Sequence, residues 1–143
     1  MSIKTTFHHV ALSVIDLEQS INWYDDVFGL KLLSRMELPH NGTLVAFVGN
    51  DNFIIELFER PDAKPLPPER SHPDTDNMTH GCKHFCVCVD DNVRFIKDLK
   101  MRGVKVAFEP EGVPDYCAFV LDPTGNLVEV FDKTNDVSII NGK

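Results

Sequence analysis

The chain contains an internal repeat, which limits the folds that it can adopt. Residues 7–14 and 82–89 both alternate apolar residues with polar or small ones, and a period of two is typical of a β-strand. Each segment is followed by apolar residues at helical spacing, and each helical pattern stops at a glycine, Gly29 or Gly103. The chain is therefore predicted to contain one structural unit twice.

Both helical patterns begin with residue types that cap helices. Asp16 is expected to cap the first helix, and Asp90 or Asp91 the second, because a carboxylate can accept hydrogen bonds from the free N–H groups of the first turn. The residues expected to face the sheet are Leu17, Ile21, Tyr24 and Phe28 in the first half and Val93, Ile96 and Leu99 in the second.

Three more strands are expected after each helix. They span residues 30–32, 43–48 and 53–59 in the first half and 104–106, 116–121 and 127–132 in the second. Turn-forming residues join the last two strands of each half, at 49–52 and at 122–126. Each half is thus predicted to run strand–helix–strand–strand–strand.

The expected organisation is a single domain built from two modules. Within residues 1–143 we expect a first module at 7–59, a crossover at 60–81, a second module at 82–132 and a tail at 133–143. The crossover contains five prolines and little periodicity, so it is expected to be irregular. A loop of this length in a small domain either contributes to function or is disordered.

The repeat places the same two potential metal ligands in each half. His9 and His84 occupy equivalent strand positions, and Glu56 and Glu129 lie at equivalent positions in apolar strands. A carboxylate in such a strand is costly to bury unless it is paired or binds a metal. If the halves pack symmetrically, two imidazoles and two carboxylates converge, and this set suits a divalent ion such as Ni, Zn, Fe, Mn or Co.

The other histidines and the four cysteines are not expected to bind the metal. His8 is expected on the opposite strand face from His9, and the remaining histidines in loops are His40, His72 and His80. The four cysteines contain no CxxC pair, so we expect free thiols, with Cys86 and Cys88 lining the cavity as small residues.

Composition excludes several classes of function. The formal net charge is −8 and the lysines and arginines are scattered, which argues against nucleic acid and anionic membrane surfaces as partners. The longest apolar run is six residues, at 116–121, whereas a membrane span needs about 20. Because the first residues lack an apolar core of signal-peptide length, we expect a cytoplasmic protein.

With these motifs in place, the chain resembles the vicinal oxygen chelate superfamily, which includes glyoxalase I, extradiol dioxygenases, methylmalonyl-CoA epimerase and bleomycin-resistance proteins. The segments that carry the resemblance are 7–33, 53–59, 81–91 and 121–132. The resemblance implies an α+β fold in which two tandem βαβββ modules form a curled mixed-sheet cup around a metal. It also implies that His9, Glu56, His84 and Glu129 are the ligands, as in glyoxalase I.

The resemblance implies a metal-dependent lyase or isomerase that acts on a small substrate with vicinal oxygens. Such an enzyme abstracts a proton next to a carbonyl and stabilises a metal-bound enediolate. Glu129 is the expected base, with Glu56 able to assist. Ser13 stands where glyoxalase I commonly has an arginine for glutathione, which argues against a glutathione adduct, and Glu56 stands where the epimerases typically have glutamine.

Two alternatives and an assembly state complete the expectations. An Fe(II) extradiol-type dioxygenase would use His9, His84 and Glu129, although Glu56 would then crowd the metal. An antibiotic-sequestering resistance protein would commonly have lost the ligands that this chain keeps. The strand edges of the two modules invite pairing, and relatives are commonly homodimers, so we expect a homodimer. Whether the site forms within one chain or across that dimer stays open.

Overall fold

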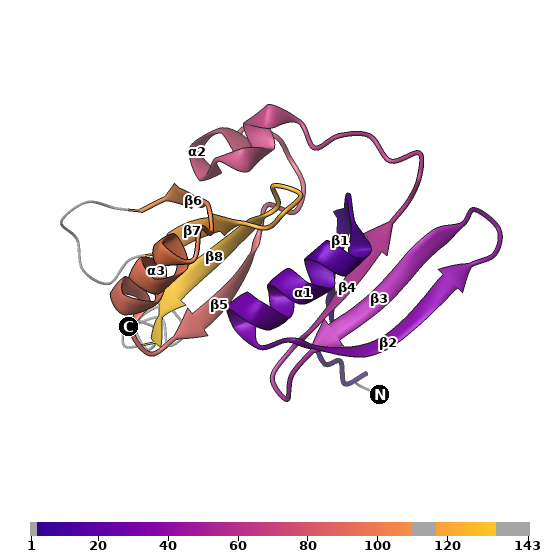
Figure 1. Ribbon diagram of the computed structural model, residues 1–143, viewed down its shortest axis with the longest axis horizontal. Helices are drawn as coiled ribbons and strands as arrows, with labels where there is room; N and C mark the ends of the chain where they lie inside the picture. Colours follow the sequence, from indigo (N-terminus) through magenta and orange to yellow (C-terminus); the bar gives the residue numbers. More distant parts are fainter. Residues whose placement is uncertain (1–2, 110–116, 134–143) are drawn as a thin grey trace. The chain divides into compact units, whose positions relative to one another are not determined.

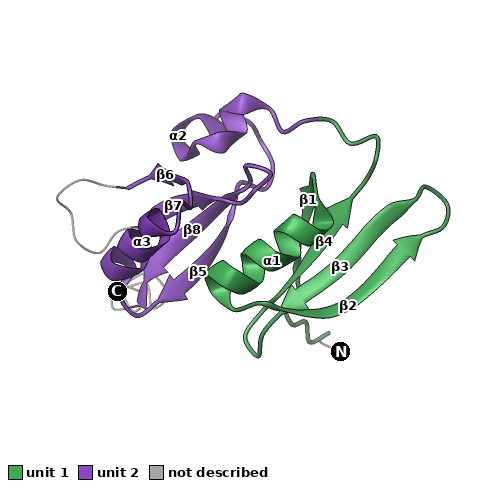
Figure 2. Cartoon of the chain, viewed as in Figure 1, with its two compact units in different colours: residues 1–64 green, residues 65–143 purple. Residues whose placement is uncertain are grey.

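The computed structural model describes residues 3–109 and 117–133. The chain forms two compact units, Met1–Lys64 and Pro65–Lys143 (Figure 2). Each unit contains one four-stranded mixed sheet and one long helix in the same order along the chain (Figure 1). The predicted α+β class, with two βαβββ modules, is therefore confirmed.

Unit 1 follows the predicted order of elements. Its elements are β1 (Val10–Val14), α1 (Leu17–Phe28), β2 (Lys31–Leu38), β3 (Thr43–Gly49) and β4 (Ile54–Glu59). The sheet has the order β1-β4-β3-β2, in which β1 and β4 are parallel and the other pairs are antiparallel. The strand that carries Glu56 thus lies in the middle of the sheet, next to the strand that follows His9.

Unit 2 repeats this topology after two short helical turns. Its elements are η1 (Pro68–Ser71), α2 (Pro73–Asp76), β5 (Phe85–Val89), α3 (Asn92–Met101), β6 (Val106–Phe108), β7 (Ala118–Leu121) and β8 (Leu127–Asp132). The sheet has the order β5-β8-β7-β6, with β5 and β8 parallel. The strand that carries Glu129 is again central.

Helix α1 has the ends that the sequence predicts. The Asp16 carboxylate accepts a hydrogen bond from the Gln19 N–H at 2.8 Å, and Gly29 closes the helix with a φ of +68° that favours glycine. The residues that α1 buries against β2, β3 and β4 are Leu17, Ser20, Ile21, Tyr24 and Val27. The predicted stripe is confirmed except at its end, where Val27 is buried and Phe28 is only half-buried.

Helix α3 corrects one core assignment. Asp91, not Asp90, caps it, and its buried residues are Asn92, Ile96 and Leu99. Val93, predicted to face the sheet, is 59% exposed. The physical reason is helical geometry: at about 100° per residue, positions 93, 96 and 99 drift around the helix, whereas 92, 96 and 99 stay on one side.

Several strand boundaries also differ from the expectation. β1 and β5 begin later than residues 7 and 82, because their pairing with the central strands starts at Val10 and Phe85. β2 extends to Leu38 because β3 pairs with it along nearly its whole length. β6 begins at Val106 because Val104 still closes α3 through a hydrogen bond to the Leu99 carbonyl. The predicted strand residue 116 and tail residues 134–143 lie outside the described residues.

The crossover at 60–81 contains η1 and α2. Its remaining residues form no helix or strand. Both helices begin with proline, which suits the first turn because its N–H would have no helical partner.

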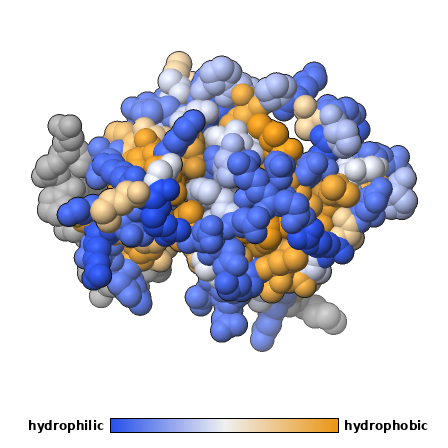
Figure 3. All heavy atoms as spheres, viewed as in Figure 1, coloured by the Kyte–Doolittle hydropathy of each residue, from blue (hydrophilic) through white to orange (hydrophobic). Residues whose placement is uncertain are grey.

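The surface is mixed in polarity. Hydrophilic and apolar residues alternate over the face seen in Figure 3, and three large apolar side chains of β2 are exposed: Leu32, Leu33 and Met36. Among the described residues, no helix combines the length and the apolar character needed to cross a membrane.

Candidate functional site

In unit 1, a histidine and a glutamate from two adjacent strands meet. His9 directly precedes β1, and Glu56 lies in β4 opposite Ala11. The distance between His9 Nε2 and Glu56 Oε2 is 3.2 Å. Both side chains remain partly accessible, 33% for His9 and 18% for Glu56, so an ion or a small molecule can reach the pair.

Unit 2 contains the equivalent pair in the equivalent register. His84 directly precedes β5, and Glu129 lies in β8 opposite Cys86. His84 Nε2 is 2.8 Å from Glu129 Oε2, and the two side chains are 30% and 17% exposed. The structure therefore brings the predicted residues together in pairs, one in each unit.

A phenylalanine supports the histidine ring of each pair. Phe47 in β3 lies opposite Glu56, and its ring is nearly perpendicular to that of His9, with centroids 5.6 Å apart. Phe119 in β7 lies opposite Glu129, and its ring centroid is 4.9 Å from that of His84. This edge-to-face packing limits the rotation of each imidazole, and the sequence analysis did not single out either phenylalanine.

The two glutamates lie on the side of each sheet that faces away from the helix. The helix side is marked by Glu59, whose carboxylate accepts a hydrogen bond from the Leu17 N–H at 2.6 Å, and by Asp132, which accepts one from the Asn92 N–H at 3.1 Å. Because side chains alternate along a strand, residues three positions earlier point to the opposite face. Neither glutamate is therefore a core residue of the helix–sheet interface.

Glu59 and Asp132, here called the helix anchors, were not predicted from the sequence. Each carboxylate ends the last strand of its unit and binds the first N–H group of its helix, where negative charge is favourable. The available signal was an acidic residue at the same position in both halves of the repeat.

Cysteines distinguish the surroundings of Glu129 from those of Glu56. Cys86 lies opposite Glu129, where unit 1 has Ala11, and desolvation followed by the negative charge of Glu129 raises the Cys86 pKa to about 12. Burial and Glu129 likewise raise the pKa of Cys117 to about 11. Both thiols are thus protonated near neutral pH, which fits lining residues better than nucleophiles or thiolate ligands. None of the four cysteines, all of which lie in the described part of the chain, forms a disulfide.

The donor atoms present in the pairs fit a divalent metal. Each pair offers one imidazole nitrogen and one carboxylate oxygen close enough to share an ion, and this mixed set suits transition metals. Within the described part of the chain, no group of three or more potential ligands gathers at one point. The four-residue site, which needs both pairs, therefore stays a prediction.

The position of His8 differs from the expectation. Its Nδ1 lies 2.7 Å from the Nδ1 of His9, and the two rings are perpendicular, with centroids 4.9 Å apart. Strand alternation was expected to separate these side chains, but both residues precede β1, so that alternation does not apply to them. His72 caps α2 by accepting a hydrogen bond from the Asp74 N–H.

Several proteins that are similar in sequence to this chain are named as enzymes. The chain is 30% identical over 132 residues to lactoylglutathione lyase of Neisseria meningitidis, covering 87% of this chain and 88% of the relative. It is 28% identical over 134 residues to lactoylglutathione lyase GLX1 of Arabidopsis thaliana, covering 89% of this chain and 44% of the relative. The chain thus spans less than half of the plant relative. A methylmalonyl-CoA epimerase of Homo sapiens matches at 29% identity over 132 residues, covering 86% of this chain and 71% of that protein.

The fold of the chain is also similar to the folds of solved structures. The trypanothione-dependent glyoxalase I of Leishmania major superposes with a TM-score of 0.77 at 20% identity, covering 97% of this chain and 94% of that one. At this identity the likeness concerns the fold alone. The model of the Glyoxalase/Bleomycin resistance protein/Dioxygenase superfamily matches residues 6–130, nearly the whole described chain, and the chain belongs to this superfamily.

Proposed function

We propose that the protein is a divalent-metal-dependent lyase or isomerase of the glyoxalase I type that acts on a small substrate with vicinal oxygens. One observation carries this proposal: the same histidine–glutamate pair occurs twice, at the same register and against the same kind of aromatic ring. The names of the relatives, a lyase and an epimerase, agree with an enzyme that moves a proton next to a carbonyl.

In this proposal His9, Glu56, His84 and Glu129 together hold one metal ion. A bound divalent metal supplies Lewis-acid stabilisation of negative charge that develops on a substrate oxygen. The ligands of one ion come either from one chain or from two copies in a homodimer. The exposed apolar side chains of β2 support the dimer, because such an edge strand otherwise invites unspecific pairing.

The reaction requires a base beside the carbon that loses its proton. Glu129 is the proposed base, because its carboxylate is accessible and its neighbours Cys86 and Cys117 are protonated thiols that do not compete for the proton. Glu129 accepts the proton and returns it to the neighbouring carbon. Glu56, equally accessible, assists from the other pair.

The substrate is proposed to be a thiol adduct other than the glutathione one, or a small keto or hydroxy acid. Ser13 provides no positive charge where glyoxalase I commonly has an arginine, and the net charge of −8 disfavours a strongly anionic partner. Four cysteines outside disulfides suit a reducing compartment, and we propose the cytoplasm as the site of action.

The dioxygenase alternative fits the structure less well. A triad of His9, His84 and Glu129 would leave Glu56 without a role, yet Glu56 pairs with its histidine just as Glu129 does. A fourth protein ligand leaves fewer positions for substrate and dioxygen.

The test combines metal analysis with a panel of substrates. Purified protein is assayed for bound metal and then for turnover of hemithioacetals of several thiols, small keto and hydroxy acids, acyl-CoA esters and catechols. The proposal predicts about one ion per four-residue site and turnover of a non-glutathione hemithioacetal or of a small keto or hydroxy acid, without oxygen uptake. Protein that binds no divalent metal would point to ligand sequestration, and oxygen uptake with catechols would point to the dioxygenase.

A further inference from the structure

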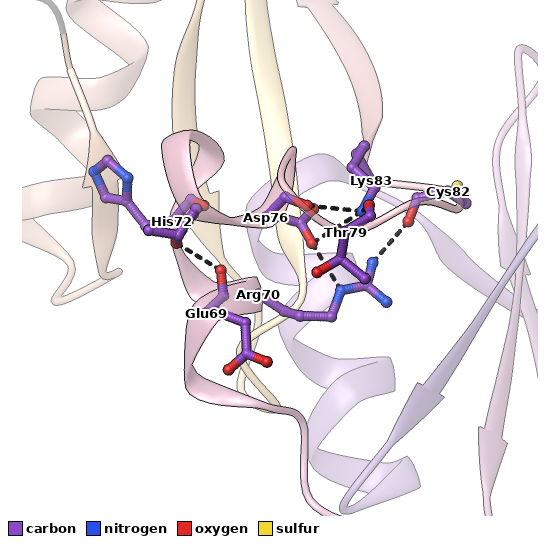
Figure 4. A network of polar contacts seen from close by, with 8 residues as sticks. Glu69, Arg70, His72, Asp76, Thr79, Cys82 and Lys83 are labelled. Atoms are coloured by element: carbon purple, nitrogen blue, oxygen red, sulfur yellow. Dashed lines mark hydrogen bonds and ion pairs between the residues drawn. The ribbon is translucent and has the colours of Figure 1, made fainter.

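A buried carboxylate organises the crossover that leads to His84. The Asp76 side chain is 1% exposed, and its Oδ1 lies 2.8 Å from Arg70 Nε and 3.4 Å from Lys83 Nζ. Figure 4 shows that Arg70, Asp76 and Lys83, here called the Asp76 cluster, come from η1, from α2 and from the segment before β5. Three parts of unit 2 therefore meet at one charged group.

The two cations of the cluster also hold backbone atoms. Arg70 Nη2 donates to the Cys82 carbonyl at 2.6 Å, while Lys83 Nζ donates to the Asp76 carbonyl at 2.8 Å and also to the Thr79 carbonyl (Figure 4). Cys82 and Lys83 are the two residues immediately before His84. The cluster thus fixes the backbone that delivers the imidazole to Glu129.

The energetics of the cluster favour a positioning role over a purely stabilising one. Burying a carboxylate is costly, and an ion pair in such a place contributes little net stability. Asp76 Oδ2 is buried and has no hydrogen-bond partner in the described structure, so part of that cost is not compensated. An apolar residue would close the loop at lower cost, but it would not fix the Cys82 carbonyl or the Lys83 side chain.

Unit 1 has a different lead-in to its histidine. Phe7 is 80% exposed, and the neighbouring polar contact of His9 in this segment is with His8. In unit 2, by contrast, the residues before His84 are tied to the buried Asp76 carboxylate.

We propose that the Asp76 cluster is a positioning device for His84. It holds the imidazole toward Glu129 before any ion binds, and thereby raises the metal affinity of the pair. Its consequence for metal affinity rests on the proposed function, whereas the orientation of His84 is a property of the metal-free chain. Asp76, Arg70 and Lys83 act through His84 and touch no substrate.

The test uses Asp76→Asn in the full chain, which keeps the shape of the side chain and removes its charge. Long-range 15N NMR of the metal-free protein reports the His84 ring, with the His9 ring as an internal reference. We expect shifted or broadened His84 signals, unchanged His9 signals, and a loss of about 10- to 100-fold in Ni²⁺ affinity measured by calorimetry, as for other residues that orient metal ligands. Asp62→Asn, which breaks an exposed ion pair with Arg60 in the same crossover, is the matched control and should leave all three readouts unchanged.

A second variant separates charge from geometry. Arg70→Lys keeps the positive charge but cannot bridge Asp76 and the Cys82 carbonyl with one planar group, so it should reproduce the His84 change. The proposal would be overturned if both variants showed unchanged His84 signals, a Ni²⁺ affinity within twofold of wild type and only a lower Tm. If Asp76→Asn does not fold, Arg70→Lys decides by the same criterion. If the wild-type protein binds no Ni²⁺ or other divalent ion, the proposed function fails, and the His84 signals alone decide the positioning role.

Discussion

The carboxylates that anchor the helices lead to a quantitative prediction for Asp132. This side chain is 5% exposed, and it accepts a hydrogen bond from the N–H of Asn92, which is itself only 4% exposed. Replacing Asp132 with alanine leaves that buried N–H without its charged acceptor. Hydrogen bonds to charged groups contribute about 1.5–3 kcal/mol, so Asp132→Ala should lower the free energy of unfolding by about 2–3 kcal/mol.

The conservative variant separates the charge from the hydrogen bond. Asp132→Asn keeps an oxygen acceptor and loses only the interaction of negative charge with the helix N-terminus. That interaction contributes about 0.3–1 kcal/mol at an exposed site and up to about 2 kcal/mol when partly buried. We therefore expect a loss of about 1 kcal/mol for Asp132→Asn. The equivalent Glu59→Ala should also destabilise, but less than Asp132→Ala, because Glu59 is less buried.

The assay is urea unfolding followed by circular dichroism, with equal m-values as the condition for comparing variants. Asp90→Asn is the control, because Asp90 is exposed and its contact with Lys133 is long, at 3.5 Å; it should change stability by less than about 0.5 kcal/mol. Metal affinity should be preserved in folded Asp132→Asn, since Asp132 and Glu129 point to opposite faces of the sheet. If Asp132→Ala lowered the free energy of unfolding by less than about 0.5 kcal/mol, the role of Asp132 as the anchor of α3 would be refuted.

Three further predictions concern the site. Glu129→Gln should keep the fold and part of the metal affinity but lower turnover by about two to four orders of magnitude, because an amide cannot accept the proton; full turnover with metal bound would move the base to Glu56. His9→Ala should lose bound metal, measured by atomic absorption, together with activity, and excess metal should restore activity partly; activity without metal would exclude the metal-dependent mechanism. In metal-free protein, the raised pKa of Cys86 keeps its thiol protonated, so alkylation of Cys86 at pH 8 should be at least about a hundredfold slower than that of a free thiol with a pKa of about 8.5. The rate, monitored by mass spectrometry, should increase with pH up to about 12. Rapid alkylation at pH 8 would contradict this prediction.

Local sequence patterns were sufficient to predict the secondary-structure elements and the repeat. The βαβββ order appears in the alternation of residues 7–14 and 82–89 and in the helical spacing that follows, because these patterns depend only on neighbouring residues. Asp16 and Gly29 mark the ends of α1 through interactions within a few residues. The repeat also identified the two histidines and the two glutamates as candidate ligands, but the pairing of each histidine with the glutamate of its own unit was found only in the structure.

Features that depend on contacts between residues far apart in the sequence appear only in the folded chain. The rotation of α3, which exposes Val93, follows from its docking on the sheet, where Asp132 holds the first N–H of the helix from 40 positions away in the sequence. The Asp76 cluster likewise joins η1, α2 and the residues before β5 through one buried carboxylate, and the sequence of the crossover shows only prolines and scattered charges. Local patterns cannot specify such contacts, because burial and partners arise only when the chain closes on itself.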